Sequence, residues 1–305
     1  MEIAIVSPIY LAEKVIPELV KRLVNTLENE GVEFEIVLVD DNSPDKSWEV
    51  IQKLAKSEKR LKGIRLSKNF GQHYAISAGI ENTLAEWVVV MDCDLQDRPE
   101  DIPVLYKKSL SGFDLVVAKR NRHGDSYFKR LSSLFFYIVL NWLTGVKYDE
   151  NLGNFGIYNK KVINSINNMR ESIRCFPIMI HWVGFNQGTI EVNHDKRLEG
   201  RSTYSIRKLL KLSLDIILAY SDKPIRLVVK LGVVISLLAV FFGAYTLIQY
   251  FSGNILVPGY SSIIISIWFL FGATISILGV IGLYVGKTFE GVKNRPIYII
   301  TETAN

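Results

Sequence analysis

Cysteine is scarce in this chain: Cys93 and Cys175 are the only two among 305 residues. Two cysteines exclude a disulfide framework and a zinc site with four cysteine ligands, and they indicate a reducing compartment. The glycine-rich signatures GxGxxG and GxxxxGK[ST] are both missing, so neither a dinucleotide-binding fold nor a P-loop enzyme is predicted. The sequence begins MEIAIVSPIY, without a basic segment ahead of a long apolar one, so we expect no cleaved signal peptide. Hydrophobic residues make up 49% and charged residues 22%, which excludes a disordered or collagen-like chain.

Charge is absent from a long segment near the C-terminus. No Asp, Glu, Lys or Arg occurs between Leu231 and Gly286. A turn rich in Gly, Asn and Pro divides this segment into Leu231–Phe251 and Ser262–Val285, and each half is long enough as a helix to cross a bilayer core of about 30 Å. We therefore predict a hairpin of two transmembrane helices. The alternative is a buried helical pair in a soluble core, where uncharged runs of this length are uncommon.

Basic residues flank both predicted spans, whereas the loop between the spans carries no charge. Lys223, Arg226 and Lys230 precede the first span, and Lys287, Lys293 and Arg295 follow the second. This distribution predicts a multi-pass protein of the inner (cytoplasmic) membrane with both termini and the N-terminal domain in the cytoplasm. The basic excess over residues 201–230 suits an anionic membrane surface or lipid headgroup. Nucleic acid is the other partner that a net charge of +5 allows, and we do not expect it because the basic residues crowd beside the spans.

Short apolar runs alternate with helical patterns through the first 120 residues. Strands are expected at Glu2–Ser7, Phe34–Asp40, Gly63–Ser67, Trp87–Asp92 and Phe113–Ala118. Helices are expected over Leu11–Leu27, from an N-cap at Ser43-Pro44, over Gln72–Leu84 and over Glu100–Ser111. The strands are continuously apolar, which is typical of strands buried on both faces. The alternation of strand and helix predicts an α/β fold with a mostly parallel sheet.

Two acidic pairs stand where strands are expected to end. Asp40-Asp41 closes the second strand, and Asp92-Cys93-Asp94 closes the fourth. Ligands of parallel sheets bind at the carboxyl ends of the strands, and carboxylates there can hold Mg²⁺ or Mn²⁺ against substrate phosphates. Aspartates in turns and helix caps are the alternative for either pair alone. Two pairs at the ends of two parallel strands favour a binding site.

Four motifs of the N-terminal domain resemble those of family 2 glycosyltransferases with the GT-A fold: SPIYLAEKVIPELV, EIVLVDDNSPDKS, RLSKNFGQHYAISAGI and VVVMDCDLQDRPEDIP. The later motifs NLGNFGIYNKKV and KRLEGRSTYSIRKL, the two spans and the tail KNRPIYII are similar to the polyisoprenyl-phosphate glycosyltransferases. That group includes dolichol-phosphate mannose synthases and bactoprenol glucosyltransferases, and the resemblance covers nearly the whole chain. It implies a cytoplasmic GT-A catalytic domain over 1–204, an interfacial amphipathic helix and linker over 205–226, a transmembrane hairpin over 227–286 and a cytoplasmic tail over 287–305.

The resemblance implies an inverting, metal-dependent transfer of a sugar from a nucleotide sugar, such as UDP-glucose, to a polyprenyl phosphate, such as undecaprenyl phosphate. The product is a polyprenyl-phospho-sugar for modification of cell-surface glycans such as the O-antigen of lipopolysaccharide. It requires a separate flippase and a downstream glycosyltransferase, and a homo-oligomer is expected. The alternatives are a membrane-docked nucleotide-sugar-binding scaffold that has lost activity and a processive polysaccharide synthase. The synthase would need more spans and usually a QxxRW motif, which this chain lacks.

The resemblance also assigns roles to single residues. Nucleotide-sugar binding is assigned to Pro8, Tyr10, Glu13, Asp41, Lys68, Asn69 and Asp92. The metal, Mg²⁺ or Mn²⁺, is assigned to Asp92, Asp94 and Gln96, and catalysis to Asp94, Asn154 and Arg120. The acceptor phosphate is assigned to Arg120, Arg130, Arg197 and Arg201, since the planar guanidinium suits phosphate.

Two further features bear on the mechanism. Many relatives carry a GDF triplet where this chain has Gly153-Asn154-Phe155, and an amide can neither act as a base nor carry charge. An acceptor phosphate is already anionic at pH 7, so no strong base is required. The segments Phe128–Thr144 and Ser205–Ser221 combine a polar stripe with an apolar face, which predicts helices lying in the membrane interface. Ordinary core-facing amphipathic helices are the alternative.

Overall fold

The computed structural model describes the chain except for residues 121–151, 170, 172, 193–216, 218–220 and 253–258. The chain divides into two compact units. The first comprises residues 1–141, 146–205 and 295–305 and contains the sheet. The second comprises residues 142–145 and 206–294 and contains two long helices.

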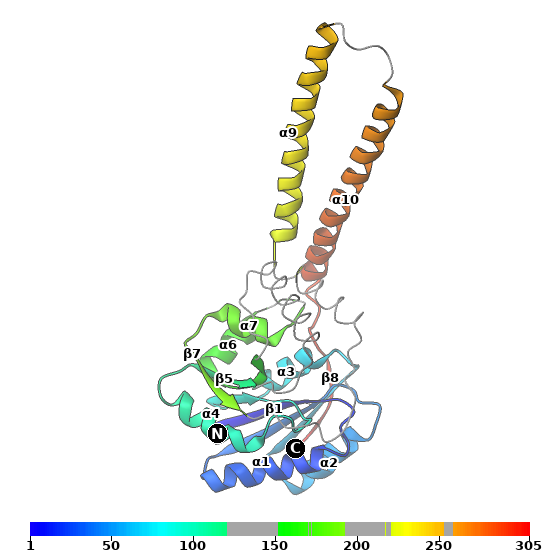
Figure 1. Cartoon of the computed structure of the whole chain (residues 1–305). Coiled ribbons are helices and arrows are strands. Elements are labelled where there is room, and N and C mark those ends of the chain that lie inside the picture. Colours follow the sequence, from blue (N-terminus) through cyan, green and yellow to red (C-terminus); the bar gives the residue numbers. More distant parts are fainter. Residues whose placement is uncertain (121–151, 170, 172, 193–216, 218–220, 253–258) are drawn as a thin grey trace. The chain divides into compact units, whose positions relative to one another are not determined.

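An eight-stranded sheet forms the centre of the first unit (Figure 1). In chain order its strands are β1 (Ile3–Ile9), β2 (Phe34–Asp40), β3 (Leu61–Leu66), β4 (Trp87–Val90), β5 (Leu115–Arg120), β6 (Leu152–Asn159), β7 (Gln187–Val192) and β8 (Ile300–Ala304). The spatial order is β7-β5-β6-β4-β1-β2-β3-β8. Strands β4, β1, β2 and β3 run parallel, β7 runs parallel to β5, β6 is antiparallel to both β4 and β5, and β8 is antiparallel to β3. The predicted α/β fold with a mostly parallel sheet is confirmed, whereas β6, β7 and β8 were not expected from the sequence.

Helices cover both faces of this sheet. On one face lie α1 (Ile16–Glu30), α2 (Ser47–Ser57), the 3₁₀ turn η1 (Pro99–Asp101) and α4 (Ile102–Ser109). On the other lie α3 (Gln72–Glu81), α6 (Lys160–Asn168) and α7 (Phe176–Val183). Side chains of β1 alternate between the two layers, with Ile3 and Ile5 in the first and Ala4 and Val6 in the second. Burial of both faces explains why the strands read as continuous apolar runs.

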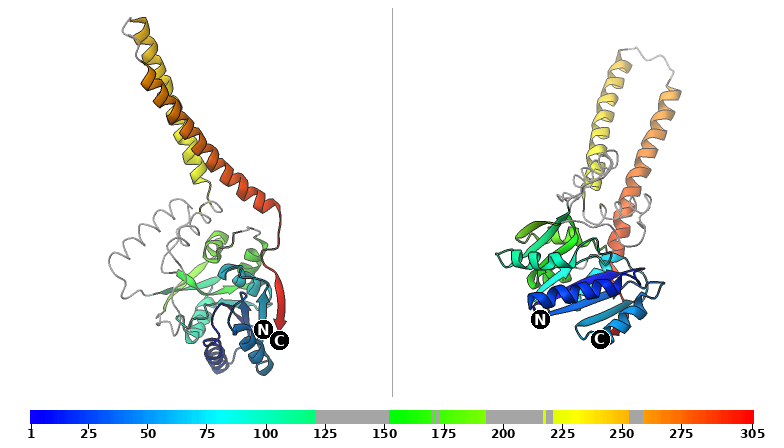
Figure 2. Two further views of the ribbon diagram at one scale, coloured as in Figure 1. Left: turned by 90° about the vertical axis from the view of Figure 1, so that its right-hand side faces the viewer. Right: turned by 60° about the horizontal axis from the view of Figure 1, so that its bottom comes forward.

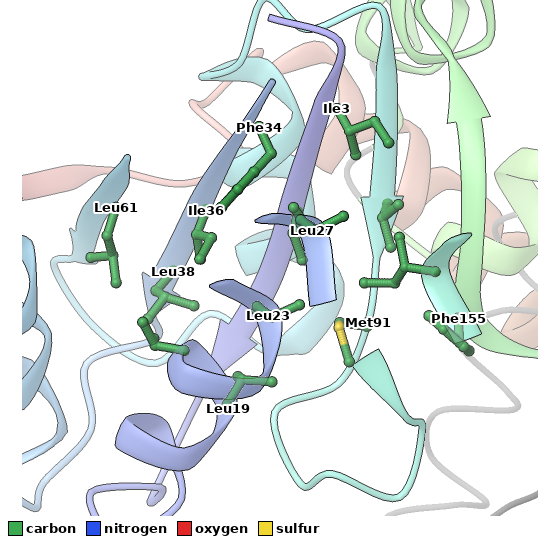
Figure 3. Close-up of a cluster of buried hydrophobic side chains, with 14 of the residues drawn as sticks. Ile3, Leu19, Leu23, Leu27, Phe34, Ile36, Leu38, Leu61, Met91 and Phe155 are labelled. Carbon is green, nitrogen blue, oxygen red and sulfur yellow. The ribbon is translucent and has the colours of Figure 1, made fainter. Parts of the chain in front are cut away.

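The stripe of leucines on α1 forms much of the first layer. Leu19, Leu23 and Leu27 are spaced four residues apart and point toward Ile36 and Leu38 of β2 (Figure 3). All of these side chains are buried. Burying one leucine side chain stabilises a fold by roughly 1.5–3 kcal/mol, so this stripe holds α1 against the sheet.

Two predicted helix starts are wrong, and the same contact explains both. Helix α1 begins at Ile16 rather than Leu11, and Leu11 has a φ of 54°, which a right-handed helix does not allow. Helix α2 begins at Ser47 rather than Ser43. The hydroxyl of Ser43 accepts a hydrogen bond from the backbone N–H of Leu11 over 3.2 Å. Ser43 therefore holds the loop after β1 instead of capping a helix.

The C-terminal strand completes one edge of the sheet (Figure 2). The backbone N–H of Ser67, just past β3, donates to the carbonyl of Ile299 over 2.9 Å. Tyr298 and Ile300 pack on the second core layer, and the Tyr298 hydroxyl donates to Glu81 of α3. Residues that follow the long helices in the sequence thus belong to the sheet.

The second unit contains α9 (Lys223–Phe251) and α10 (Tyr260–Val292), which contact each other. The Tyr284 hydroxyl donates to the carbonyl of Ser221 over 2.8 Å. Of the residues that the structure describes, one stretch, Phe269–Val292, is long and apolar enough to cross a membrane, with a mean hydropathy of 2.0 and none of it buried. The hairpin of two spans stays a prediction. Phe128–Thr144 and all but two residues of Ser205–Ser221 lie outside the described residues.

Candidate active site

The strand register brings the predicted site residues to one edge of the sheet. Ile9 of β1 pairs with Asp40 of β2, and Val6 pairs with Val90 of β4. The chain therefore leaves β1, β2 and β4 at the same carboxyl edge, where ligands of parallel sheets bind. The loops there contain residues with positive φ that are not glycine: Leu11 (54°), Asn42 (53°) and Leu95 (57°). Such residues cost about 1–3 kcal/mol each and cluster at functional sites.

Hydrogen bonds tie the loop after β1 to the loop after β2. The backbone N–H of Ala12 donates to Ser47 Oγ over 3.1 Å, and that of Glu13 donates to Asp45 Oδ2 over 3.2 Å. In return, Glu13 Oε2 accepts from the backbone N–H of Lys46 over 3.1 Å. These hydrogen bonds hold the two loops together, and Glu13 takes part through its side chain as well as its backbone.

Asp41 braces the loop after β3. Its Oδ1 accepts from the backbone N–H of Phe70 and its Oδ2 from that of Gly71, both over 2.8 Å. The carboxylate is buried, and burial raises the pKa of Asp41 while the two hydrogen bonds offset part of that rise. Asp40 beside it is fully buried, accepts from the backbone N–H of Ser43, and also has its pKa raised by burial.

Asp92 accepts hydrogen bonds from two side-chain amides. Gln72 Nε2 lies 2.6 Å from Asp92 Oδ1, and Asn154 Nδ2 lies 3.4 Å from the same oxygen. The antiparallel pairing of Val90 with Gly156 explains the second contact, because two further steps in register place Asp92 opposite Asn154. Gln72 is a site residue that was not predicted from the sequence. The available signal was its position at the start of the helix that follows a parallel strand.

The side chains at the end of β4 fit a hard divalent cation. Asp92 and Asp94 are both partly exposed and supply carboxylate oxygens, which Mg²⁺ and Mn²⁺ prefer. Cys93 lies between them, and burial together with the neighbouring carboxylates raises its pKa to about 12, so without a bound cation its thiol is protonated at neutral pH. Asp94 Oδ1 also accepts from the backbone N–H of Gln96 over 3.1 Å. Within the described part of the chain, no three acidic, His or Cys side chains are grouped so as to hold an ion.

The other residues predicted to bind the nucleotide sugar or the acceptor phosphate are spread over several elements. Pro8 is buried within β1, whereas Tyr10 follows it at the edge with 42% of its surface exposed. Lys68 and Asn69 are exposed in the loop after β3. Arg120 ends β5, where its backbone pairs with Val192 of β7. Arg130, Arg197 and Arg201 lie outside the described residues.

Comparison with known proteins identifies the class of protein that this fold and site define. The sequence profile of Glycosyl transferase family 2 matches residues 4–169, which contain the acidic loops and the site residues of β6. The chain belongs to this family and is a glycosyltransferase.

Relatives match the chain over nearly its full length. An "Uncharacterized glycosyltransferase" of Synechocystis is 34% identical over 303 residues, which cover 99% of this chain and 95% of that protein. A "Prophage bactoprenol glucosyl transferase homolog" of Escherichia coli is 33% identical, covering 98% of each chain. The "SfII prophage-derived bactoprenol glucosyl transferase" of Shigella flexneri is also 33% identical, covering 99% of this chain and 98% of that protein.

Solved structures of other proteins are similar to this chain in fold. Mannosyl-3-phosphoglycerate synthase from Rubrobacter xylanophilus matches with a TM-score of 0.53 and 15% identity, over 72% of each chain. Glucosyl-3-phosphoglycerate synthase from Mycobacterium tuberculosis, in complex with Mn²⁺, UDP and phosphoglyceric acid, matches with a TM-score of 0.52 and 18% identity, over 72% of this chain and 76% of that chain. At these identities the likeness extends to the fold alone.

Proposed function

We propose that the protein transfers a hexose from a UDP-sugar, such as UDP-glucose, to a polyprenyl phosphate, such as undecaprenyl phosphate, at the cytoplasmic face of the membrane. The observation that carries the proposal is that Asp41, Asp92 and Asp94 follow β2 and β4 at the same edge of the sheet, and that one short segment, Phe70–Gln72, donates hydrogen bonds to both Asp41 and Asp92. The relatives named bactoprenol glucosyl transferase support a polyprenyl acceptor.

The donor occupies the edge formed by the loops after β1, β2 and β4. Asp41 accepts from the N–H of the base, for which each of its oxygens retains a second lone pair. Tyr10 and Glu13 border the base and ribose, and Lys68 and Asn69 contact the donor from the loop after β3. Asp92, Asp94 and Gln96 hold Mg²⁺ or Mn²⁺, which when bound neutralises negative charge on the diphosphate.

The acceptor supplies its own nucleophile. A phosphate oxygen of the lipid forms a bond to the anomeric carbon, the bond from that carbon to the UDP oxygen breaks, and UDP leaves with the electron pair. Attack from the face opposite UDP inverts the anomeric centre. Arg120, together with Arg130, Arg197 and Arg201, pairs with the acceptor phosphate. No protein base is needed, because the attacking oxygen is already anionic at pH 7.

The C-terminal helices anchor the enzyme beside its lipid acceptor. In this proposal α9 and α10 cross the membrane as a hairpin. The basic residues at the start of α9 and the end of α10 keep these ends, and with them the catalytic domain, in the cytoplasm. The product then requires a separate flippase and a second glycosyltransferase on the other side of the membrane. We propose a homo-oligomer as the working form.

A transfer assay tests the proposal. The full-length protein in detergent receives undecaprenyl phosphate, Mn²⁺ or Mg²⁺ and one radiolabelled UDP-sugar at a time. We expect a labelled lipid with one sugar, and we expect the label to vanish with EDTA or with Asp94→Asn. Asp222→Asn is the matched control, because Asp222 is exposed, directly precedes α9 and pairs with Arg226 of that helix. Absence of a labelled lipid with every UDP- and GDP-sugar, from folded protein that binds UDP, would overturn the proposal in favour of a scaffold.

A further inference from the structure

One short segment connects the two acidic loops. The backbone N–H groups of Phe70 and Gly71 donate to Asp41, and the side chain of the next residue, Gln72, donates to Asp92. Gly71 has a φ of 108°, a conformation that residues with a side chain rarely adopt. Because of this turn, consecutive residues donate to different carboxylates. The segment therefore fixes the positions of the Asp41 and Asp92 carboxylates relative to each other.

The contacts on Asp92 restrict one particular rotation. The terminal torsion of an aspartate side chain is broad, so an unsupported carboxylate has no strongly preferred plane. Gln72 approaches Asp92 Oδ1 from the start of α3, and Asn154 approaches the same oxygen from β6. Two donors from two separate elements therefore fix the plane of this carboxylate.

We propose that Gln72 and Asn154 are positioning residues that hold the Asp92 carboxylate in the orientation that binds a divalent cation together with the donor diphosphate. This inference rests on the proposed function. The inference also gives a role to Asn154, which stands where many relatives carry aspartate. An ionised aspartate accepts hydrogen bonds only, whereas the Asn154 amide donates one to Asp92. Asn154 acts through Asp92 and contributes no proton transfer of its own.

Metal binding measures this role without reference to turnover. Mn²⁺ is titrated into the full-length protein saturated with UDP, and free Mn²⁺ is followed by electron paramagnetic resonance. Gln72→Met and Asn154→Leu remove the amides while keeping similar side-chain volumes. Gln187→Ala is the control, because Gln187 is an exposed glutamine at the start of β7.

We expect Gln72→Met to weaken Mn²⁺ binding by about 10–100-fold, the usual effect of removing a hydrogen-bond partner of a metal ligand. Asn154→Leu should weaken it less, since its hydrogen bond is the longer of the two. UDP binding measured in EDTA should stay at the wild-type level in both variants. In an Asp92→Asn background, Gln72→Met should cause no further loss of Mn²⁺ affinity, because the group it positions is gone.

The inference is overturned if Gln72→Met binds Mn²⁺ as Gln187→Ala does, or if it weakens UDP binding equally in EDTA, which would indicate a merely structural role. Should Gln72→Met fail to fold, Gln72→Asn carries the same test, because it withdraws the amide by one methylene. Failure of the proposed function looks different: the wild-type protein itself would then bind no Mn²⁺ with UDP, or would transfer no sugar.

Discussion

Replacing Glu302 by alanine should loosen the edge of the sheet at β8. Trp48 Nε1 donates to Glu302 Oε2 over 2.9 Å, and Arg65 Nη1 lies 3.2 Å from Glu302 Oε1. Trp48 is 3% exposed, so removing its acceptor leaves a largely buried N–H unpaired at a cost of about 1–3 kcal/mol. The ion pair with Arg65 is half exposed and adds only about 0.2–1 kcal/mol.

The consequence is measurable as a lower temperature of unfolding. A domain of about 200 residues loses about 2–4 °C per kcal/mol, so the two losses together should lower the apparent midpoint of thermal unfolding of Glu302→Ala by roughly 2–16 °C. Glu302→Gln keeps an acceptor for Trp48 and removes the charge, so it should fall between the wild type and Glu302→Ala. Thr303→Ala is the control, because Thr303 is an exposed neighbour in the same strand.

The assay is thermal unfolding of the full-length protein in one detergent, followed by intrinsic tryptophan fluorescence. Equal midpoints for Glu302→Ala and Thr303→Ala would refute the reasoning. They would mean that the contacts of β8 with Trp48 and Arg65 add nothing to the stability of the sheet.

Two further predictions concern packing and pH. Gly79→Ala should lower the unfolding midpoint, because a Cβ at position 79 would lie 2.2 Å from Val6 Cγ1. Such overpacking costs about 1–3 kcal/mol, whereas alanine gains only about 1 kcal/mol in helix propensity over glycine. An unchanged midpoint would contradict the close approach of α3 to β1. Burial lowers the pKa of His73 to about 4, and its Nδ1 accepts from the backbone N–H of Phe176. Since the unfolded chain takes up this proton near pH 6.5 and the folded chain does not, stability should fall as pH drops from about 6.5 toward 4. His73→Asn retains an acceptor without that titration, so its unfolding midpoint should change less over this window; equal pH profiles would count against the assignment.

Much of the site followed from local sequence. The runs ending in Asp40-Asp41 and Asp92-Cys93-Asp94 are apolar enough to specify buried strands, and parallel strands present their carboxyl ends at one edge. The aspartates could therefore be placed at that edge from the sequence alone. Their partners could not, because Phe70, Gly71 and Gln72 lie on another strand–helix connection, and which carboxylate each of them reaches depends on how that connection folds.

Errors occurred where tertiary contacts override local preference. Ser43-Pro44 carries the chemistry of a helix start, but the Ser43 hydroxyl is taken by the backbone of Leu11, a residue 32 positions away. The strand Ile300–Ala304 was missed for a related reason. It is short and largely exposed, and it becomes a strand by pairing with β3.

By itself the sequence determined the class of the fold, the apolar C-terminal segment and the acidic residues at the candidate site, because hydrophobic periodicity and charge are local properties of the chain. Only the tertiary structure decided which groups meet: two amides on one oxygen of Asp92, two backbone N–H groups on Asp41, and a C-terminal strand at the edge of the sheet. Those contacts depend on strand register and loop conformation, which arise when distant segments pack together.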